Sequence, residues 1–311
     1  MPTITEYIKR QKNPRHITFS DDETEIVIEN RHFCPPLHLS GRGFPTIKRP
    51  GYSGCAVRFK NCSGIRVDGF QTLGGLYGVW LENCDDIIFY EVQAGMVGQE
   101  CFVVRSTDGK LHRYVQWVGG KLHNSGRKNP QYGEGAYFGT GAPPRLGIVA
   151  NISMAHVAFE HLTAEAVDVK PDCASSSVSN CQFNHIDLPF NGVITLRTSG
   201  QTGVRSWHKY RNLDIKNFTN RNGYRANAFA IGAGNVDIEG SRVERPSDRS
   251  KAVQLYGTFE ELQNRRVRVR GNEFYGWQGA HDALKDGSNG LAEFKHGNNL
   301  YCPERIEGST P

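Results

Sequence analysis

Short alternations of apolar and polar residues run along most of the chain and predict β-strands. The stretches "VRFKNCSGIRVDGF" and "VWLENCDDIIFYEV" carry this alternation and match each other at a spacing of 22 residues, residues 57–70 on residues 79–92. In this match Asn61 falls on Asn83 and Cys62 on Cys84. An alternation of period two is typical of strands, and a repeat of 20–25 residues is typical of a solenoid.

Two series of strand-like segments continue the repeat through the chain. The first series reads "CAVRF", "GVWLE", "CFVVR", "GAYFG", "AVDVK", "VITLR", "AFAIG" and "AVQLY". The second reads "GIRVDGF", "IIFYEV", "YVQWVGG", "ISMAHVAF", "SSVSNCQF", "NLDIKNF", "NVDIEGS" and "VRVRGNEF". Eight such units without a convincing amphipathic helix predict an all-β fold, a parallel β-helix of about eight coils stacked ~4.8 Å apart.

The whole chain, residues 1–311, is expected to form this single domain. Residues 1–24 contain "ITEYIKRQ", which predicts a short helix that caps the first coil. Alternation fades after residue 275, so residues 276–311 are expected to form an irregular C-terminal tail.

No apolar run approaches the ~20 residues of a membrane span, so no membrane partner is expected. The start "MPTITEYIKRQKNP" has no apolar core of a signal peptide. We therefore expect a secreted protein whose leader is absent from this chain, with a cytoplasmic protein as the alternative. The net charge of +5 favours an acidic polymer as partner. Among such polymers we expect a uronate polysaccharide rather than nucleic acid, and the sequence sets no oligomeric state.

Eight cysteines occur without any CxxC pair, which disfavours a zinc ribbon. Their number is too small for a disulfide scaffold. Buried free thiols are expected, and a bridge from Cys62 to Cys55 or Cys84 is the alternative.

Equivalent positions of successive coils stand above one another, so the alternation can be read as columns. Aligning "YGEGAYFGTG" with "AEAVDVKPD" places Glu134 over Glu165 and Tyr137 over Asp168. The predicted inward residues are Phe102, Val104, Ala136, Phe138, Val167, Val169, Ile194 and Leu196. The predicted outward column is Arg58, Trp80, Val103, Tyr137, Asp168 and Thr195. The column at the strand starts contains Tyr77, Glu100, Glu134 and Glu165, and the column at the strand ends contains Lys60, Glu82, Arg105, Gly139, Lys170 and Arg197.

Three glutamates stacked ~5 Å apart repel one another unless a cation compensates them. Sets of carboxylates without histidine suit Ca²⁺ or Mg²⁺. The candidate metal ligands are Glu100, Glu134, Glu165 and Asp168. The alternative is a solvent-facing ladder of charges in which Glu165 pairs with Lys170.

The coil series and the two aligned phrases resemble the right-handed parallel β-helix proteins of the pectate-lyase-like superfamily, over roughly residues 26–275. This resemblance implies a polysaccharide-active enzyme, most often a lyase that acts on uronate polymers. It further implies that acidic side chains hold Ca²⁺ against the substrate carboxylate, while a Lys or Arg removes the C5 proton. The candidate catalytic residues on this face are Lys170, Arg197, Tyr137 and Arg105.

Other functions on the same fold stay open. A hydrolase similar to the polygalacturonases would carry the motifs NTD, DD, GHG and RIK in that order. The sequence does not contain the four motifs in this order. An epimerase would use the same proton abstraction as a lyase. A non-catalytic glycan-binding module or phage-type adhesin would instead spread outer aromatic residues along the solenoid; the candidates are Trp80, Trp117, Tyr137 and Trp207.

Overall fold

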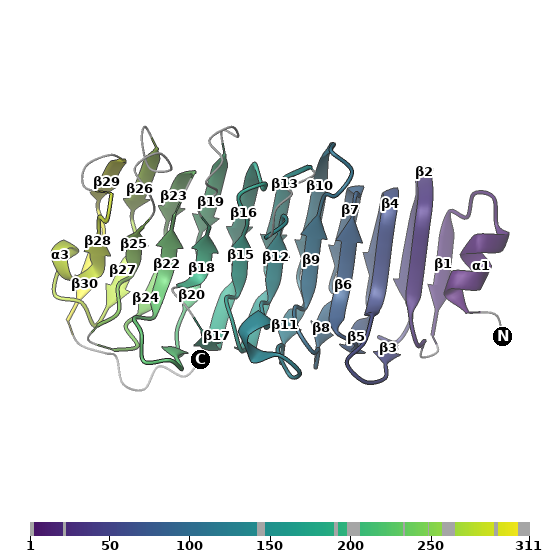
Figure 1. Cartoon of the computed structure of the whole chain (residues 1–311), viewed down its shortest axis with the longest axis horizontal. Helices are drawn as coiled ribbons and strands as arrows, with labels where there is room; N and C mark the ends of the chain where they lie inside the picture. The colour runs from purple at the N-terminus through teal and green to yellow at the C-terminus, as the bar shows by residue number, and fades with distance from the viewer. Residues whose placement is uncertain are drawn as a thin grey trace.

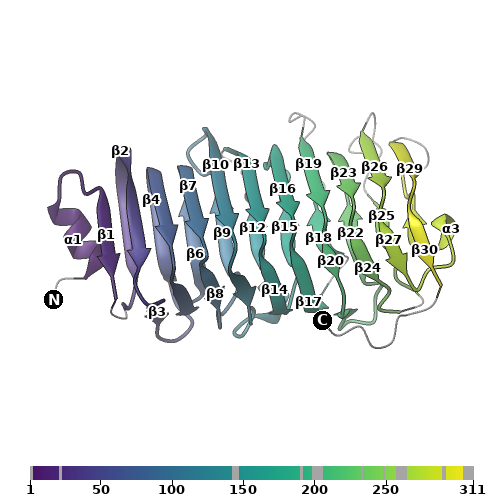
Figure 2. The ribbon, with the colours of Figure 1, turned by 180° about the vertical axis from the view of Figure 1, so that it is seen from behind.

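A computed structural model describes residues 3–20, 23–141, 147–189, 192–197, 206–232, 234–247, 249–256, 265–288 and 292–303. These residues form a right-handed parallel β-helix whose coils stack along the long axis (Figures 1 and 2). The predicted fold class is therefore confirmed. Every pairing between coils is parallel, and each coil turns through three faces.

The first face, called the site sheet below, carries the functional candidates. Its strands are the first part of β2 (Ile26–Gly41), the first part of β4 (Cys55–Asp68), β6 (Tyr77–Glu82), β9 (Phe102–Arg105), β12 (Ala136–Phe138), β15 (Val167–Val169), β18 (Gly192–Leu196), β22 (Asn227–Ile231), β25 (Val253–Leu255) and β28 (Leu284–Lys285). In β2 and β4 a single long strand bends and continues into the second face.

The second face adds an equally long row. Its strands are β1 (His16–Phe19), the second parts of β2 and β4, β7 (Asp85–Tyr90), β10 (Leu111–Val118), β13 (Ile148–Ala155), β16 (Ser175–Ser179), β19 (Trp207–Arg211), β23 (Asn235–Glu239), β26 (Arg266–Arg270) and β29 (Glu293–Gly297).

The third face closes the coil. Its strands are β3 (Thr46–Arg49), β5 (Gln71–Gly74), β8 (Gln93–Gly95), β11 (Lys121–His123), β14 (Ala158–Leu162), β17 (Gln182–Leu188), β20 (Asp214–Ile215), β21 (Phe218–Asn220), β24 (Arg242–Glu244), β27 (Glu273–Tyr275) and β30 (Leu300–Cys302).

The two ends differ in how well the sequence predicted them. Helix α1 (Ile4–Arg10) forms where the short cap helix was expected, and Thr3 starts it with a capping box. Its Ile4 and Ile8 are buried against the first coil. The expectation of an irregular tail after residue 275 is wrong for the described part, because α3 (Ala280–Ala283), β28, β29 and β30 build a further coil there. None of the described helices is long and apolar enough to cross a membrane.

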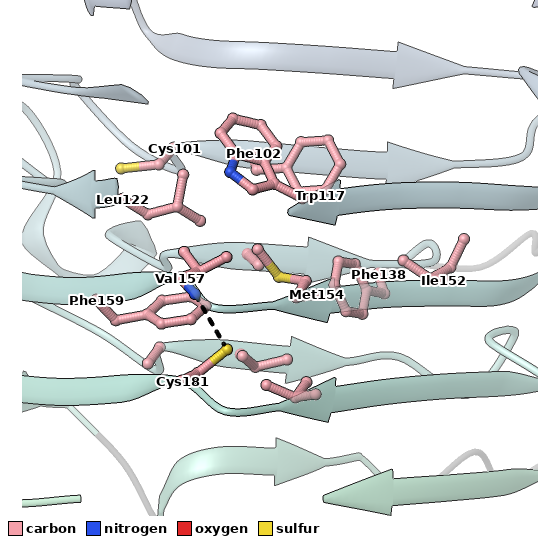
Figure 3. Close-up of a cluster of buried hydrophobic side chains, with 14 of the residues drawn as sticks. Cys101, Phe102, Trp117, Leu122, Phe138, Ile152, Met154, Val157, Phe159 and Cys181 are labelled. Carbon is pink, nitrogen blue, oxygen red and sulfur yellow. Dashed lines mark hydrogen bonds between the residues drawn. The ribbon is translucent and has the colours of Figure 1, made fainter. Parts of the chain in front are cut away.

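Inward side chains fill the coil with stacked aromatic and aliphatic layers (Figure 3). Phe102 lies 4.8 Å from Trp117 and 6.2 Å from Phe138 between ring centres. Trp117 is fully buried, so its expected role as a sugar-stacking residue on the outer face is wrong. All eight cysteines are free thiols, and five of them are buried. The expectation of buried free thiols is therefore confirmed for these five.

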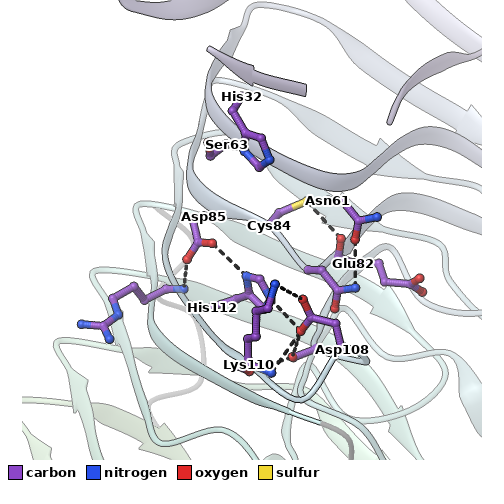
Figure 4. Close-up of polar contacts among 12 residues, drawn as sticks. His32, Asn61, Ser63, Glu82, Cys84, Asp85, Asp108, Lys110 and His112 are labelled. Carbon is purple, nitrogen blue, oxygen red and sulfur yellow. Dashed lines mark hydrogen bonds and ion pairs between the residues drawn. The ribbon is translucent and has the colours of Figure 1, made fainter. Parts of the chain in front are cut away.

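Asparagines form a ladder at the bend between the site sheet and the second face. Asn30, Asn61 and Asn83 occupy this bend in successive coils, each with a positive φ of 52–56°. The Asn61 side chain donates to Asn30 (2.8 Å), and the Asn83 side chain donates to Asn61 (3.0 Å; Figure 4). Asn83 Oδ1 in turn accepts from the Thr107 backbone N–H at 2.7 Å. The repeated Asn in the sequence is therefore a turn residue that tolerates the left-handed conformation and links neighbouring coils.

Replacing Asn83 by alanine should lower the free energy of unfolding by about 1–3 kcal/mol. The variant loses the ladder hydrogen bonds and places alanine at a left-handed φ. Urea unfolding followed by circular dichroism measures the change. Asn83→Gly keeps the backbone conformation and should lose less, and equal losses in both variants would show that the φ angle contributes nothing.

Candidate active site

The predicted columns of the site sheet are confirmed by the strand registers. Tyr137 pairs with Val103 on one side and Asp168 on the other, and Trp80 and Thr195 continue the column. The predicted inward residues are all buried. Alternation along short strands was therefore enough to place each candidate residue in its coil.

Four carboxyl groups gather on the outer side of this sheet. One carboxylate oxygen from each of Glu134, Glu165 and Asp168 lies within 4.8 Å of the other two. Glu100 stands one coil before Glu134, at the same register. The alternative of a solvent-facing ladder is wrong: Glu134, Glu165 and Asp168 are 3%, 1% and 0% exposed. We name these four residues the carboxylate cluster.

Two long basic side chains lie across the carboxylate cluster and help to cover it. Arg197 Nη2 donates to Glu165 Oε1 at 2.6 Å, and Arg197 Nε donates to Asp168 Oδ1 at 3.1 Å. Lys170 Nζ donates to Asp168 Oδ2 at 2.5 Å, so Lys170 pairs with Asp168 and not with Glu165 as the alternative held. Both cations follow the ends of their strands, which lets their side chains reach back over the sheet.

Burial and mutual repulsion change the protonation of the glutamates. Burial raises the pKa of Glu100 to about 7, and the charge of Asp168 adds to the rise. Burial and Asp168 likewise raise the pKa of Glu165 to about 7, against the opposing charge of Arg197. The pKa of Glu134 lies well above its usual range, because of burial first and then the charges of Asp168, Glu100 and Glu165. One Oε2 atom on each glutamate is buried and accepts no hydrogen bond within the described part of the chain.

This arrangement fits a divalent cation. Four carboxyl groups face two basic side chains, which leaves an excess of negative charge whenever the glutamates are ionised. The orphaned Oε2 atoms are oxygen donors of the kind that Ca²⁺ and Mg²⁺ prefer. Protons on the glutamates are the competing way to remove the same charge.

The melting temperature should fall as the pH rises from about 5 to about 8. The folded protein holds protons on Glu100 and Glu165 up to about pH 7, whereas the unfolded chain releases them near 4.5. More protons are then bound in the folded state within this window, so stability decreases with rising pH. Differential scanning fluorimetry at both pH values measures the effect, and added calcium should raise the melting temperature most at pH 8.

Glu134→Gln and Glu165→Gln should each reduce the rise in melting temperature that calcium causes. Each should also reduce the fall in melting temperature between pH 5 and pH 8. Glu160→Gln is the matched control, because Glu160 lies on the third face and pairs with Lys121 at the surface. If calcium does not change the melting temperature of the native chain, the carboxylate cluster does not bind calcium. The expected fall of the melting temperature with pH would not be affected by this result.

Tyr137 and Lys170 lie next to each other on the solvent side of the cluster. Lys170 Nζ is 4.4 Å from the centre of the Tyr137 ring. Burial, followed by the charges of Asp168, Glu134 and Glu100, raises the pKa of Tyr137 and keeps its hydroxyl protonated. The pair therefore offers a phenol that can donate a proton beside an amine.

Arg105 is on the predicted face but outside the carboxylate cluster. Its Nε and Nη2 donate to Glu82 Oε2 at 2.9 and 2.5 Å, and Lys60 pairs with the other Glu82 oxygen. Its guanidinium also lies over the Trp80 ring, 4.3 Å from the ring centre. Arg105, Glu82 and Trp80 border a hollow of about 300 Å³ that extends toward the N-terminal coils. Arg105 thus belongs to a neighbouring part of the outer face, two coils from Asp168.

Tyr256 is a residue that sequence reasoning missed. It follows β25 at the register that Arg197 occupies after β18, with Gly232 between them. Glycine leaves the space across which Tyr256 Oη donates to the Leu196 carbonyl at 3.1 Å. Tyr256 closes the segment "AVQLY", so extending the strand-end column by two coils would have found it.

Comparison with known proteins establishes the fold. No protein-family model matches the chain, and no curated protein sequence matches it. Among solved structures, an alginate lyase from Paenibacillus sp. str. FPU-7 superposes with a TM-score of 0.65, 13% identity and 96% of each chain covered. A GH136 lacto-N-biosidase from Eubacterium ramulus matches 95% of this chain and 63% of its own, with 9% identity and a TM-score of 0.48. These likenesses concern the arrangement of the coils.

Proposed function

We propose that the protein is a polysaccharide lyase that cleaves a uronate polymer by β-elimination on the outer face of the site sheet. The observation that carries this proposal is the position of Lys170 Nζ over the Tyr137 ring, 4.4 Å from its centre, above a buried group of carboxylates and beside Arg197. The raised pKa of Tyr137 keeps its hydroxyl protonated. The fold shared with an alginate lyase along nearly the whole chain supports the same choice of substrate class, since alginate is a uronate polymer.

β-Elimination requires a base at C5, an acid at the bridging O4 and compensation of the uronate charge. In the proposed reaction Lys170 first passes one proton to Asp168, its hydrogen-bond partner at 2.5 Å. The resulting Lys170 amine takes the C5 proton, the C4–O4 bond breaks, and a C4=C5 double bond forms. Tyr137 gives its phenolic proton to O4 of the leaving sugar. Transfer of the proton from Lys170 to the Tyr137 phenolate then restores both groups, so the cycle balances without a further reactant.

The charge that develops on the substrate carboxylate needs a cation close by. Arg197 borders the site with a partly exposed guanidinium, held in place by Glu165 and Asp168. A divalent cation held by Glu134, Glu165 and Asp168 would supply further positive charge. The carboxylate cluster thereby acts as the support that fixes the basic groups.

A screen of uronate polymers tests the proposal. Alginate and polygalacturonate are incubated with the protein, with and without calcium, and the products are followed by ultraviolet absorbance and by reducing ends. A lyase produces both signals together because each cleavage creates a double bond. Reducing ends without absorbance would indicate hydrolysis, and neither signal on any uronate polymer would contradict the proposed reaction.

A further inference from the structure

A second hollow lies on the adjoining face, away from the carboxylate cluster. It covers strands β10, β13, β16 and β19 of the second face and has a volume of about 490 Å³. The residues that matter for its chemistry are Tyr114, Asn151, Ser153, Ser177, Trp207 and Lys209. Nothing in the proposed reaction uses any of these side chains.

Two aromatic side chains stand at its ends. Tyr114 directly precedes Val115, which pairs with Ile152, so Tyr114 lies beside Asn151 in the next coil. The Asn151 backbone N–H donates to the Ser175 hydroxyl one coil further on, and Ser175 pairs with Trp207 in the coil after that. Tyr114 and Trp207 are thus three coils apart, or ~14 Å at the usual strand spacing. Both rings are exposed, at 50% for Tyr114 and 36% for Trp207.

Small polar side chains form the floor between the two rings. Asn151 and Ser175 lie in the intervening coils. The next column along the strands consists of Gln116, Ser153, Ser177 and Lys209. Serine and asparagine leave the floor low while offering hydroxyl and amide groups for hydrogen bonding. The result is a trough that runs along the axis of the solenoid.

Neighbouring contacts fix the position of Tyr114. His112 contacts Asp85 at 2.8 Å through Nδ1 and Asp108 at 3.0 Å through Nε2, and the Arg113 backbone N–H donates to Asp85 at 2.8 Å (Figure 4). Tyr114 itself has a φ of 67°, a left-handed conformation that tyrosine seldom adopts. The backbone that carries Tyr114 is thus held in place before a ligand binds, so this part of the trough needs little ordering on binding.

Three basic side chains adjoin the trough, and one of them, Arg268, also lies 3.9 Å from Asp237. The Arg113 guanidinium lies 6.0 Å from the centre of the Tyr114 ring, and that of Arg268 lies 6.0 Å from the Trp207 ring. Lys209 is exposed in the floor. These charges complement an acidic ligand, and the two rings present flat faces to stack on sugar rings.

We propose that this trough is a secondary binding site for an extended segment of an acidic polysaccharide. The two rings stack on sugars about three coils apart, the floor hydrogen-bonds the hydroxyl groups between them, and Lys209 meets a carboxylate. The identity of the polymer rests on the proposed function, whereas the binding itself does not require cleavage. The trough holds the polymer on the protein and so raises its local concentration at the active site.

Affinity electrophoresis in native gels that contain alginate tests this proposal. The experiment uses the full chain carrying Lys170→Ala, so that the gel polymer stays intact. Alginate should retard this protein, and adding Trp207→Ala or Tyr114→Ala should remove most of the retardation, while Trp207→Phe keeps it. Tyr90→Ala is the matched control, because Tyr90 is 54% exposed on the same face but outside the trough.

The outcomes separate the binding site from the enzyme. Retardation that depends on Trp207 supports the trough even if no uronate polymer is cleaved. Equal retardation of the parent and the Trp207→Ala protein overturns it even if cleavage is found. If a gel of neutral hydroxyethylcellulose retards the protein as strongly as the alginate gel does, the proposal that the ligand is acidic is wrong. Circular dichroism of each variant checks that the fold is intact.

Discussion

Lys170→Ala should abolish the rise in ultraviolet absorbance on a uronate polymer, with a fall in kcat of roughly 10²–10⁴-fold, the range typical for loss of a general base. Lys170 Nζ lies over the Tyr137 ring, and alanine removes the group that takes the C5 proton in the proposed reaction. Tyr137→Phe should give a loss of similar size, because it removes the acid for O4 while leaving Lys170 and its contact with Asp168 in place.

Lys121→Ala is the matched control for this prediction. Lys121 is likewise paired with a carboxylate, Glu160, but lies on the third face. It should leave the rate unchanged. Full activity of the Lys170→Ala protein would contradict the assignment, and Arg105 would then be the next candidate base on this face.

Arg197→Ala should both cut activity severely and lower the free energy of unfolding by about 3 kcal/mol. The arginine connects Glu165 with Asp168, and both carboxylates are buried. Without it, Glu165 loses the charge that opposes the rise of its pKa, so the ionised form becomes still less favourable. The loss of stability should therefore be larger at pH 8 than at pH 5, where the glutamates hold their protons.

Arg211→Ala separates this effect from the loss of any arginine. Arg211 pairs with Glu239 at the surface, where an ion pair contributes about 0–1 kcal/mol. Urea unfolding of both variants at the two pH values provides the comparison. A loss for Arg197→Ala that is the same at pH 5 and pH 8 would show that repulsion in the carboxylate cluster does not control stability.

The register of the site was predictable from the sequence, but the environment of its residues was not. Alternation of period two determines which residues of each strand point outward, and a one-residue slip would have reversed them all. This is why Tyr137, Asp168 and the strand-end cations were placed correctly. Whether an outward glutamate is exposed depends instead on which side chains from other coils lie over it. Lys170 and Arg197 lie over the cluster, and strand patterns carry no information on that.

The same distinction explains the other differences. Trp117 lies in a strand whose alternation was recognised, but it was taken as an outer residue, and it packs inside the coil. Arg105 stands in the expected column, yet its guanidinium is held by Glu82 and Trp80 rather than by the carboxylate cluster. The last coil was missed because its strands are short and weakly alternating, at two to five residues each.

The distribution of the site over many coils limits how this protein can change in length. From Glu100 to Tyr256 the relevant residues occupy six successive strands of the site sheet, β9 to β25, and several of their contacts join different coils. Duplicating or deleting one whole coil before β6 or after β25 would leave all of these distances intact. Inserting one coil between β15 and β18 would instead separate Glu165 from Arg197 by one further strand spacing. Related genes that vary in the number of coils should therefore differ at the ends of the solenoid and keep the number between β9 and β25 constant.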